Sequence, residues 1–281
     1  MARKKAIRVE YGTSVWQWIS IAIVAAFIVV PLYVTVTGGF KSIGELRTQP
    51  FALPESWDWS NFAAVLSGGR FEQMMLNSLF IASVTIVLTV MLASMAAFAI
   101  VHVKFFGSNY LAAFFTIGLL FPVATAILPV FLTLRDANLL NSAWGVILPQ
   151  VAFGLAFAIM LFRSFFAELP RELIEAARMD RCGYLGTYWY VVLPLSLPII
   201  ATVGVFTFMS SWNSYLLPLV TLSAEDRYTW PLGIQAYQGS YSTDWPKLLA
   251  LLTLTLAPAV AFFLIAQRYI IAGLTGGAVK G

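Results

Sequence analysis

Six long stretches without a single Asp, Glu, Lys or Arg dominate this sequence. Their apolar cores are residues 15–36, 73–101, 105–134, 137–162, 190–222 and 248–267. Each is long enough for a helix to cross a bilayer, which takes about 20 residues. A charged side chain at the centre of a membrane helix costs about 2.5–3.5 kcal/mol on insertion scales, so such runs are typical of membrane spans. The sequence therefore predicts an all-α integral membrane protein with six transmembrane helices.

Composition agrees with a lipid environment. Of the 281 residues, 60% are hydrophobic and 11% are charged, which is more apolar surface than a soluble fold can bury. The single Cys182 excludes an internal disulfide, and with the single His102 it cannot form a zinc site of the usual spacing. We interpret His102, at the end of the second span, as an interfacial residue rather than a catalytic one. We expect no metal site, no cofactor bound by this chain and no nucleic-acid partner.

An even number of spans places both termini on one side, and the basic residues indicate which side. With a cytoplasmic N-terminus, 11 of the 17 Lys and Arg residues lie inside. The inside set is Arg3, Lys4, Lys5, Arg8, Lys104, Arg163, Arg171, Arg178, Arg181, Arg268 and Lys280, and the outside set is Lys41, Arg47, Arg70, Arg135, Arg227 and Lys247. We therefore expect both termini to be cytoplasmic, in a multi-pass protein of a prokaryotic plasma or inner membrane.

This topology gives the domain organisation. The apolar run after residue 14 is longer than a signal-peptide core and ends without a convincing cleavage site, so we interpret it as a retained first helix. Residues 1–14 before it then form a cytoplasmic segment. Residues 15–271 form one six-span domain, with a cytoplasmic loop at 163–190, and residues 272–281 form a cytoplasmic tail. The loops at 38–72 and 223–246 then face outward.

Aromatic and proline residues add two expectations. We interpret the tryptophans of the outward loops as interfacial anchors in preference to ligand contacts; they are Trp57, Trp59, Trp230 and Trp245. Prolines within the spans indicate kinked helices, around a pathway or simply for packing; they are Pro122, Pro129, Pro149, Pro194 and Pro198.

The absence of charged residues from the spans and of a nucleotide-binding motif from the sequence limits the possible transport mechanisms. No Asp, Glu, Lys or Arg lies in the cores of the spans, which disfavours a carrier coupled to an intramembrane carboxylate. The sequence has no G-x-x-x-x-G-K-[ST] phosphate loop, so uphill transport would need a motor on another chain. A stand-alone secondary carrier or channel for a small neutral solute stays open, whereas an intramembrane enzyme is disfavoured because no paired nucleophile and base is visible.

The cytoplasmic loop contains a predicted amphipathic helix. Pro170 suits its first turn, and the following residues place Leu173, Ile174 and Ala177 on an apolar face. Arg171, Glu175 and Arg178 have the spacing of helical ion pairs, and Ala176 with Ala177 leaves room for another surface. The helix either lies on the headgroups as a solvated connector or docks another protein.

The same residues resemble a known family. Permease subunits of binding-protein-dependent ATP-binding-cassette importers carry a loop of the form E-A-A, three residues, G, nine residues, I-x-L-P. Glu175-Ala176-Ala177 matches its start, and Val191, Leu193 and Pro194 match its end. The resemblance implies the type I importer permease fold and a coupling helix that sits in a cleft of a separate ATPase. It implies ATPase-coupling roles for Glu172, Glu175, Ala176, Ala177, Arg178, Asp180, Arg181 and Gly183.

One position departs from the family pattern. The family glycine falls on Arg181, two residues before Gly183. A left-handed backbone costs a non-glycine residue about 1–2 kcal/mol. Either Arg181 bears that strain or the turn shifts to Gly183, and the sequence does not choose between them.

Further motifs resemble the carbohydrate branch of this family. They are LPESWDWSNF at residues 53–62, the Asn77-Ser78 pair, Trp212-Asn213 and the tail from Gly273 to Gly281, which resembles the smaller permease of maltose-type transporters. The resemblance implies that Gly276, Gly277 and Lys280 contact the ATPase, although a frayed terminus would look the same. It also implies that Gln235, Ala236, Tyr237 and Gln238 contact the binding protein.

The function implied is half of the translocation pathway of an ATP-driven sugar importer, without enzymatic activity of its own. The expected partners are a second permease subunit in a heterodimer, an ATPase dimer that binds ATP and Mg²⁺, and an extracytoplasmic sugar-binding protein or lipoprotein. Asn77, Trp212, Asn213 and Tyr215 are the candidate pathway residues, although polar residues in membranes also serve helix packing.

Overall fold

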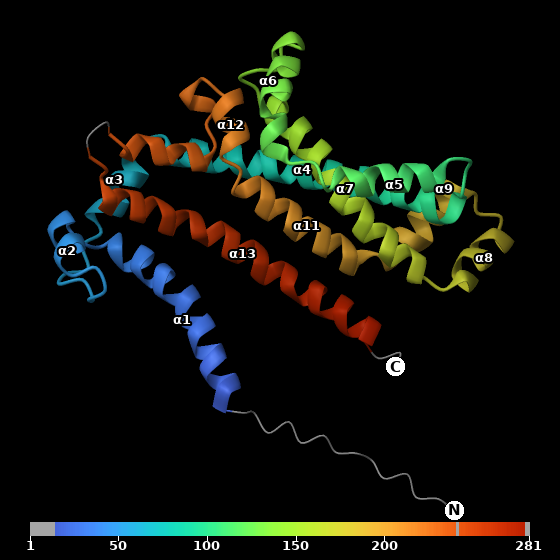
Figure 1. Cartoon of the computed structure of the whole chain (residues 1–281), viewed down its shortest axis with the longest axis horizontal. Helices are drawn as coiled ribbons and strands as arrows, with labels where there is room; N and C mark the ends of the chain where they lie inside the picture. Colours follow the sequence, from blue (N-terminus) through green and yellow to red (C-terminus); the bar gives the residue numbers. More distant parts are fainter. Residues whose placement is uncertain (1–14, 240–241, 279–281) are drawn as a thin grey trace, which may run out of the picture. The chain divides into compact units, whose positions relative to one another are not determined.

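The computed structural model describes residues 15–239 and 242–278, with side chains through Gln267. All regular elements in this part of the chain are helices, which confirms the all-α prediction (Figure 1). In order they are α1 (Val15–Gly38), α2 (Ile43–Thr48), α3 (Ser60–Ser67), α4 (Phe71–Phe98), η1 (Ala99–Val103), α5 (Ser108–Gly118), η2 (Val123–Ala126), α6 (Ile127–Asp136), α7 (Ala143–Glu168), α8 (Arg171–Met179), α9 (Tyr184–Thr187), η3 (Tyr188–Val192), α10 (Leu193–Leu195), α11 (Leu197–Trp212), α12 (Leu216–Thr221), η4 (Glu225–Arg227), η5 (Trp230–Tyr237) and α13 (Trp245–Ala278).

The predicted spans match the helices of the described residues. Four continuous stretches are long and apolar enough to cross a membrane: Val15–Gly38, Phe71–Val103, Ala143–Glu168 and Trp245–Gln267. Two more are bent pairs, Ser108–Gly118 with Val123–Asp136 at 93° and Tyr184–Leu195 with Leu197–Trp212 at 77°. Counting each pair as one span gives the six that the sequence predicts. The fifth predicted span does not continue to Leu222, because α11 ends at Trp212 and α12 is a separate short helix.

Prolines mark both bends, as the sequence predicts. Pro122 has no amide hydrogen and follows the turn that ends α5, so it cannot continue that helix. Ser196 separates α10 from α11 between Pro194 and Pro198. Pro149 and Pro129, in contrast, lie inside α7 and α6. The third and fifth spans are therefore broken at points that the sequence identifies.

Residues 15–65 and Thr243–Thr253 form one compact unit, built from α1, α2, α3 and the start of α13. Its loop folds around Phe40, whose ring contacts those of Trp57, Trp59 and Phe62 at centroid distances of 4.6–5.0 Å. Gly39 is required here because a methyl group at this position would lie 2.7 Å from the Phe62 ring. Trp57, Trp59 and Trp245 are exposed, as interfacial anchors would be.

A buried lysine holds this loop. Lys41 is only 1% exposed, and its Nζ donates to the carbonyl oxygens of Gln49 at 2.9 Å, Pro50 at 3.1 Å and Ala52 at 2.6 Å. An ammonium group has three hydrogens, so all of its donors are satisfied. The Lys41 side chain therefore fixes the residues that follow α2 against the start of the loop.

Residues 66–242 and 254–278 form the second unit, whose centre is the pair α4 and α7 with α11 packed on α4 (Figure 1). Small residues line the contact between α4 and α7, including Ala93, Ala97, Gly154 and Ala158. Small side chains let membrane helices approach closely, where van der Waals contact stabilises them. At one end of this pair, Phe98, Phe162, Phe166 and Tyr188 form a buried cluster. This cluster supports α8, the helix predicted to dock a partner.

Candidate functional site

Helix α8 forms where the sequence predicts an amphipathic helix. It runs from Arg171 to Met179, directly after Pro170. Ile174 and Ala177 are buried, and Ile174 belongs to the cluster of Phe98, Phe166 and Tyr188. These contacts hold one side of α8 against the rest of the second unit. The opposite side of the helix is exposed and could contact a partner.

The C-terminus of α8 shows how Arg181 takes the place of the family glycine. Arg181 has φ +58°, whereas Gly183 has φ −68°, so the turn does not shift. The Arg181 amide donates to the Arg178 carbonyl at 3.0 Å, and the Cys182 amide donates to the Ala177 carbonyl at 2.9 Å. These two bonds define a Schellman motif, which satisfies the last helical carbonyls. Of the two alternatives that the sequence left open, the structure has Arg181 in the left-handed conformation.

Two expectations about the faces of α8 are wrong. Leu173 is 40% exposed instead of joining the apolar face, and Ala177 is 5% exposed instead of sharing an open surface with Ala176. Successive residues of an α-helix are rotated by about 100°, so Ala176 lies on a different side from Ala177, whereas Leu173, four residues before Ala177, lies at the exposed edge of the buried side. Ala177 therefore packs within the chain, and only Ala176 offers close approach to a partner.

The exposed face of α8 carries Glu172, Ala176 and Met179. Met179 is 84% exposed, and nothing in the helical pattern of the sequence singled it out. A large apolar side chain this exposed at the end of a helix is a usual component of a protein interface. Asp180, Arg181 and Gly183 are also exposed beside it. We define Glu172, Ala176 and Met179 as the outer face of α8.

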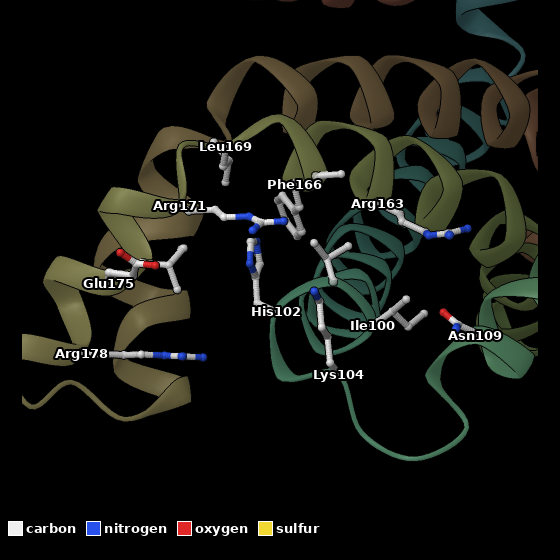
Figure 2. A pocket seen from close by; sticks show the side chains of 13 residues that line it. Ile100, His102, Lys104, Asn109, Arg163, Phe166, Leu169, Arg171, Glu175 and Arg178 are labelled. Atoms are coloured by element: carbon white, nitrogen blue, oxygen red, sulfur yellow. The ribbon is translucent and has the colours of Figure 1, made fainter.

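The predicted ion pairs of α8 do not form. No carboxylate lies within 4.0 Å of Arg171 or Arg178 in the described part of the chain, although Glu175 has the right spacing. Arg178 instead lies over the ring of Tyr184, 5.7 Å from its centroid. Both arginines turn toward a cavity between α8, α7 and η1 (Figure 2).

This cavity has a volume of about 500 Å³ and a basic lining. Its polar residues include His102, Lys104, Arg163, Arg171, Glu175 and Arg178. Figure 2 shows Arg171, Lys104 and His102 pointing into one space, with Arg163 on the side away from α8. The His102 Nε2 atom is buried and has no hydrogen-bond partner among the described residues. We call this the basic cavity. From the sequence, Lys104 and Arg163 served only to indicate the topology.

At the other end of α4, Asn77 binds the segment 226–230. Its Nδ2 donates to the carbonyls of Asp226 at 2.9 Å and Tyr228 at 3.0 Å, and its Oδ1 accepts from Gln73 at 2.9 Å. The Trp230 amide donates to Ser78 Oγ at 2.9 Å. The Asn77-Ser78 pair thus anchors this segment to α4. Asn77 also lines a cavity of about 280 Å³, and its pathway role stays a prediction.

A second asparagine secures the same loop. Asn141 has φ +53°, a left-handed conformation that Asn adopts more readily than most residues. Its Oδ1 accepts from the amides of Ser223 at 3.2 Å and Ala224 at 3.0 Å. Arg70 and Glu225 add an ion pair of 2.7 Å, which is exposed and therefore weak. The sequence did not identify Asn141, whose role depends on contacts between residues 82 and 83 positions apart.

The remaining pathway candidates differ in environment. Trp212 is 2% exposed and stacks on Phe208, so its ring packs inside the second unit. Trp230 is also buried, 6.0 Å from Trp212 between ring centroids, so the interfacial interpretation is wrong for this residue. Asn213 and Tyr215 are exposed, and the Asn213 Nδ2 donates to the Met209 carbonyl at 2.9 Å.

The structure brings Tyr215 to the loop predicted to contact a binding protein. The Gln235 Nε2 donates to Tyr215 Oη at 3.1 Å. Gln235, Ala236 and Gln238 are exposed, and Tyr237 is half-buried at the end of η5. Tyr215, a predicted pathway residue, therefore lies beside the loop that is predicted to contact a binding protein.

A polar group inside the helix pair was missed. Gln150 of α7 accepts at Oε1 from Ser211 Oγ at 2.7 Å and from Thr85 Oγ1 at 3.3 Å. These bonds join α7 to α11 and α4 deep in the apolar spans. The signal in the sequence is a Gln within a 26-residue apolar helix, and a criterion based on charged residues does not identify it because Gln is uncharged.

The tail is only partly described. Helix α13 continues through Gly276 and Gly277 and ends at Ala278. Lys280 lies outside the described residues, as do residues 1–14, which were predicted to be cytoplasmic. The predicted contacts of the tail with an ATPase stay predictions.

Comparison with known proteins decides the family. Residues 89–276 match the family described as "Binding-protein-dependent transport system inner membrane component". The chain belongs to this family. It is therefore a multi-pass inner-membrane component of an ATP-binding-cassette importer and a transport subunit, not an enzyme.

Relatives of known name support the assignment. The chain is 32% identical over 269 residues to the probable ABC transporter permease protein YurM of Bacillus subtilis, covering 96% of this chain and 89% of the relative. It is 32% identical to the diacetylchitobiose uptake permease NgcG of Streptomyces coelicolor, covering 91% and 85%. It is 33% identical to the arabinooligosaccharide permease AraQ of Halalkalibacterium halodurans, covering 94% and 95%.

A solved structure shows the same fold. The crystal structure of a bacterial ABC transporter involved in alginate import contains a chain that superposes with a TM-score of 0.80 at 22% identity, covering 95% of this chain and 99% of that one. The predicted ABC importer permease fold is thus confirmed. Family membership also favours the importer subunit over a stand-alone carrier, because importers of this family work with an ATPase and a substrate-binding protein.

Proposed function

We propose that this chain is one of two permease subunits of an ATP-driven sugar importer. The observation that carries the proposal is the relationship to permeases named for saccharides, including diacetylchitobiose, arabinooligosaccharides and, at 32% identity, trehalose. The span cores contain no Asp, Glu, Lys or Arg, which suits an uncharged saccharide. The second permease would be a different chain that supplies the other half of the pathway.

The coupling element in this proposal is α8, on the cytoplasmic side. On its outer face, the small side chain of Ala176 lets a partner come close to the helix backbone. Charged Glu172 and apolar Met179 lie on either side of it along the helix. A cleft of the ATPase that closes on ATP and Mg²⁺ would move α8. Because α8 is fixed to the Phe166 and Tyr188 cluster through Ile174, that motion would reach α7 and η3 directly.

The outward side would meet an extracytoplasmic sugar-binding protein or lipoprotein. The surface of Tyr215 and Gln235–Gln238 offers exposed amides and a phenol, groups suited to hydrogen bonding with a saccharide or a protein loop. Asn77 and Asn141 hold the preceding segment against α4 and the start of α7, so this surface has a rigid support. Alternating access between the two sides then follows from movement of α8.

The test is sugar uptake by the complete importer in proteoliposomes. A Glu175→Lys variant should assemble normally but lose most ATP-dependent uptake, because it reverses a charge on the docking helix α8 itself. Glu72→Lys, an exposed glutamate at the start of α4, is the matched control and should transport normally. Normal uptake in Glu175→Lys would contradict the coupling role.

A second arm tests the alternative class. The chain is reconstituted alone, and solute entry is followed under a proton or sodium gradient. No entry is expected without the ATPase and the second permease. Gradient-driven uptake by this chain alone would overturn the proposal in favour of a stand-alone carrier. A panel of trehalose, diacetylchitobiose and maltotriose, applied to the complete importer, identifies the saccharide.

A further inference from the structure

The basic cavity is poorly compensated by the chain itself. Four cationic side chains, Lys104, Arg163, Arg171 and Arg178, line it with a single carboxylate, Glu175. None of the four forms an ion pair within the described residues. Like charges around a common space repel one another, and the repulsion is stronger where the protein displaces water. The cavity therefore has the charge of an anion site.

The cationic groups of the cavity can donate hydrogen bonds to an anion. The His102 Nε2 is buried without a partner among the described residues. Arg171 and Arg178 present guanidinium groups, whose planar forks match the oxygens of a phosphate, and Lys104 adds a compact charge. With a volume of about 500 Å³ the cavity exceeds the size of a phosphate group, so a larger headgroup also fits.

Its position is at the boundary between membrane and water. Lys104 directly follows the span Phe71–Val103, and Arg163 lies in the last turns of α7. Phe106 is fully exposed and Tyr110 is 81% exposed, as lipid-facing aromatic residues are at an interface. The cytoplasmic leaflet carries anionic lipids that basic pockets between transmembrane helices recognise.

We propose that the basic cavity binds a phosphate group, either of an anionic phospholipid headgroup or of free phosphate, and that the bound anion ties α8 to η1 and α7. The proposal rests on the proposed function only for the side of the membrane on which the cavity lies. The outer face of α8, with Glu172, Ala176 and Met179, does not line the cavity, so the anion and the ATPase would contact different residues of this helix. This separation favours a phosphate over an acidic segment of the ATPase.

The experiment measures binding to the complete importer in detergent by native mass spectrometry, without sugar or nucleotide. The probes are dioctanoyl phosphatidylglycerol, zwitterionic dioctanoyl phosphatidylcholine and inorganic phosphate. Wild type should bind phosphatidylglycerol or phosphate, and phosphatidylcholine should bind more weakly. The Lys104→Gln/Arg163→Gln variant should bind the anionic probe about 25-fold more weakly, because each basic residue contributes about fivefold beside an anionic surface.

The matched control is Arg135→Gln, which removes a cation paired with Asp136 far from this cavity in the sequence, and it should bind like wild type. If the double variant fails to assemble, Lys104→Gln alone should still show about a fivefold loss. Persistence of phosphatidylglycerol binding in millimolar phosphate identifies the lipid as the source, whereas displacement by phosphate identifies the free anion.

Two results would overturn the inference. One is equal binding of both anionic probes to wild type and to the double variant. The other is a double variant that loses its ATPase subunit while anion binding stays unchanged, which would assign the cavity to an acidic segment of that subunit. Because binding is read without transport, failure here is distinguishable from failure of the proposed sugar transport.

Discussion

The Cys182 amide donates a hydrogen bond of 2.9 Å to the Ala177 carbonyl, and this bond ends α8 with Arg181 in the left-handed conformation. A residue with a Cβ atom is strained there, since the Cβ approaches the following carbonyl oxygen. The hydrogen bonds of the Schellman motif and the buried Ala177 over-determine the turn, so Arg181 is held in it.

Replacement of Arg181 by glycine should relieve this strain. We expect Arg181→Gly to stabilise the α8 turn by about 0.5–1 kcal/mol, because glycine adopts positive φ without a steric penalty. The gain is smaller than the strain itself, since glycine also has more conformational freedom to lose when the chain folds. Hydrogen exchange of the amides of residues 176–183 measures the effect. Gly183→Ser is the control: φ is −68° and no atom lies within 4 Å of an added Cβ, so exchange should hardly change. Faster exchange in Arg181→Gly would contradict the strain argument.

The two alanines of the motif should respond differently to the same substitution. Ala176→Arg should leave the permease pair assembled but reduce retention of the ATPase about tenfold or more, because a bulky charge enters the proposed interface. Ala177→Arg should destabilise the subunit itself by about 3 kcal/mol or more, since it buries a charge beside Ile174. Co-purification and thermal aggregation separate the outcomes. Ala236→Arg, in η5, should affect neither; equal effects at 176 and 177 would refute the assignment of faces.

Removal of the Asn77 amide should loosen the segment that it binds. Asn77→Leu leaves the carbonyls of Asp226 and Tyr228 without their donors, at a cost of about 1–3 kcal/mol. Hydrogen exchange across residues 223–235 should rise accordingly. Asn213→Leu loses only a bond to its own helix and serves as the control. If Asn77→Leu instead raises the KM for sugar with unchanged exchange, the side chain acts on the pathway and not on the loop.

The loop around α2 should weaken in acid. The Ser42 amide, at 2.7 Å, and then the Glu55 amide, at 3.0 Å, donate to the Glu45 carboxylate and hold its pKa below the ordinary value of 4.5. A group whose pKa is lowered by folding stabilises the fold at pH values above its unfolded pKa, and this contribution is lost as the pH falls through the lowered value. Protease cleavage of residues 42–55 should therefore increase below pH 4.5.

In Glu45→Gln this acid-induced increase should largely disappear, because the amide oxygen does not titrate. Glu72→Gln, an exposed glutamate with no hydrogen bond or ion pair in the described structure, should leave the pH profile as in wild type. An unchanged profile in Glu45→Gln would show that another group controls the loop.

Much of this protein follows from its sequence. Charge-free runs determine the spans because lipid does not solvate ionic groups, and prolines determine two of the bends because they lack an amide hydrogen. The amphipathic period determines that α8 exists, and the E-A-A motif identifies its family. These features depend on local chemistry, so they can be read without knowing which segments meet.

Tertiary structure alone decided the rest. It determined that Ile174 and Ala177 face the core while Ala176 does not, since the rotation of a helix about its axis depends on the surface it packs against. It brought Asn77 to Asp226 and Lys104 to Arg171, residues whose meeting depends on the packing of distant helices. It also decided that Arg181, and not Gly183, carries the left-handed turn, because the hydrogen bonds that fix this turn form only when α8 ends at Met179.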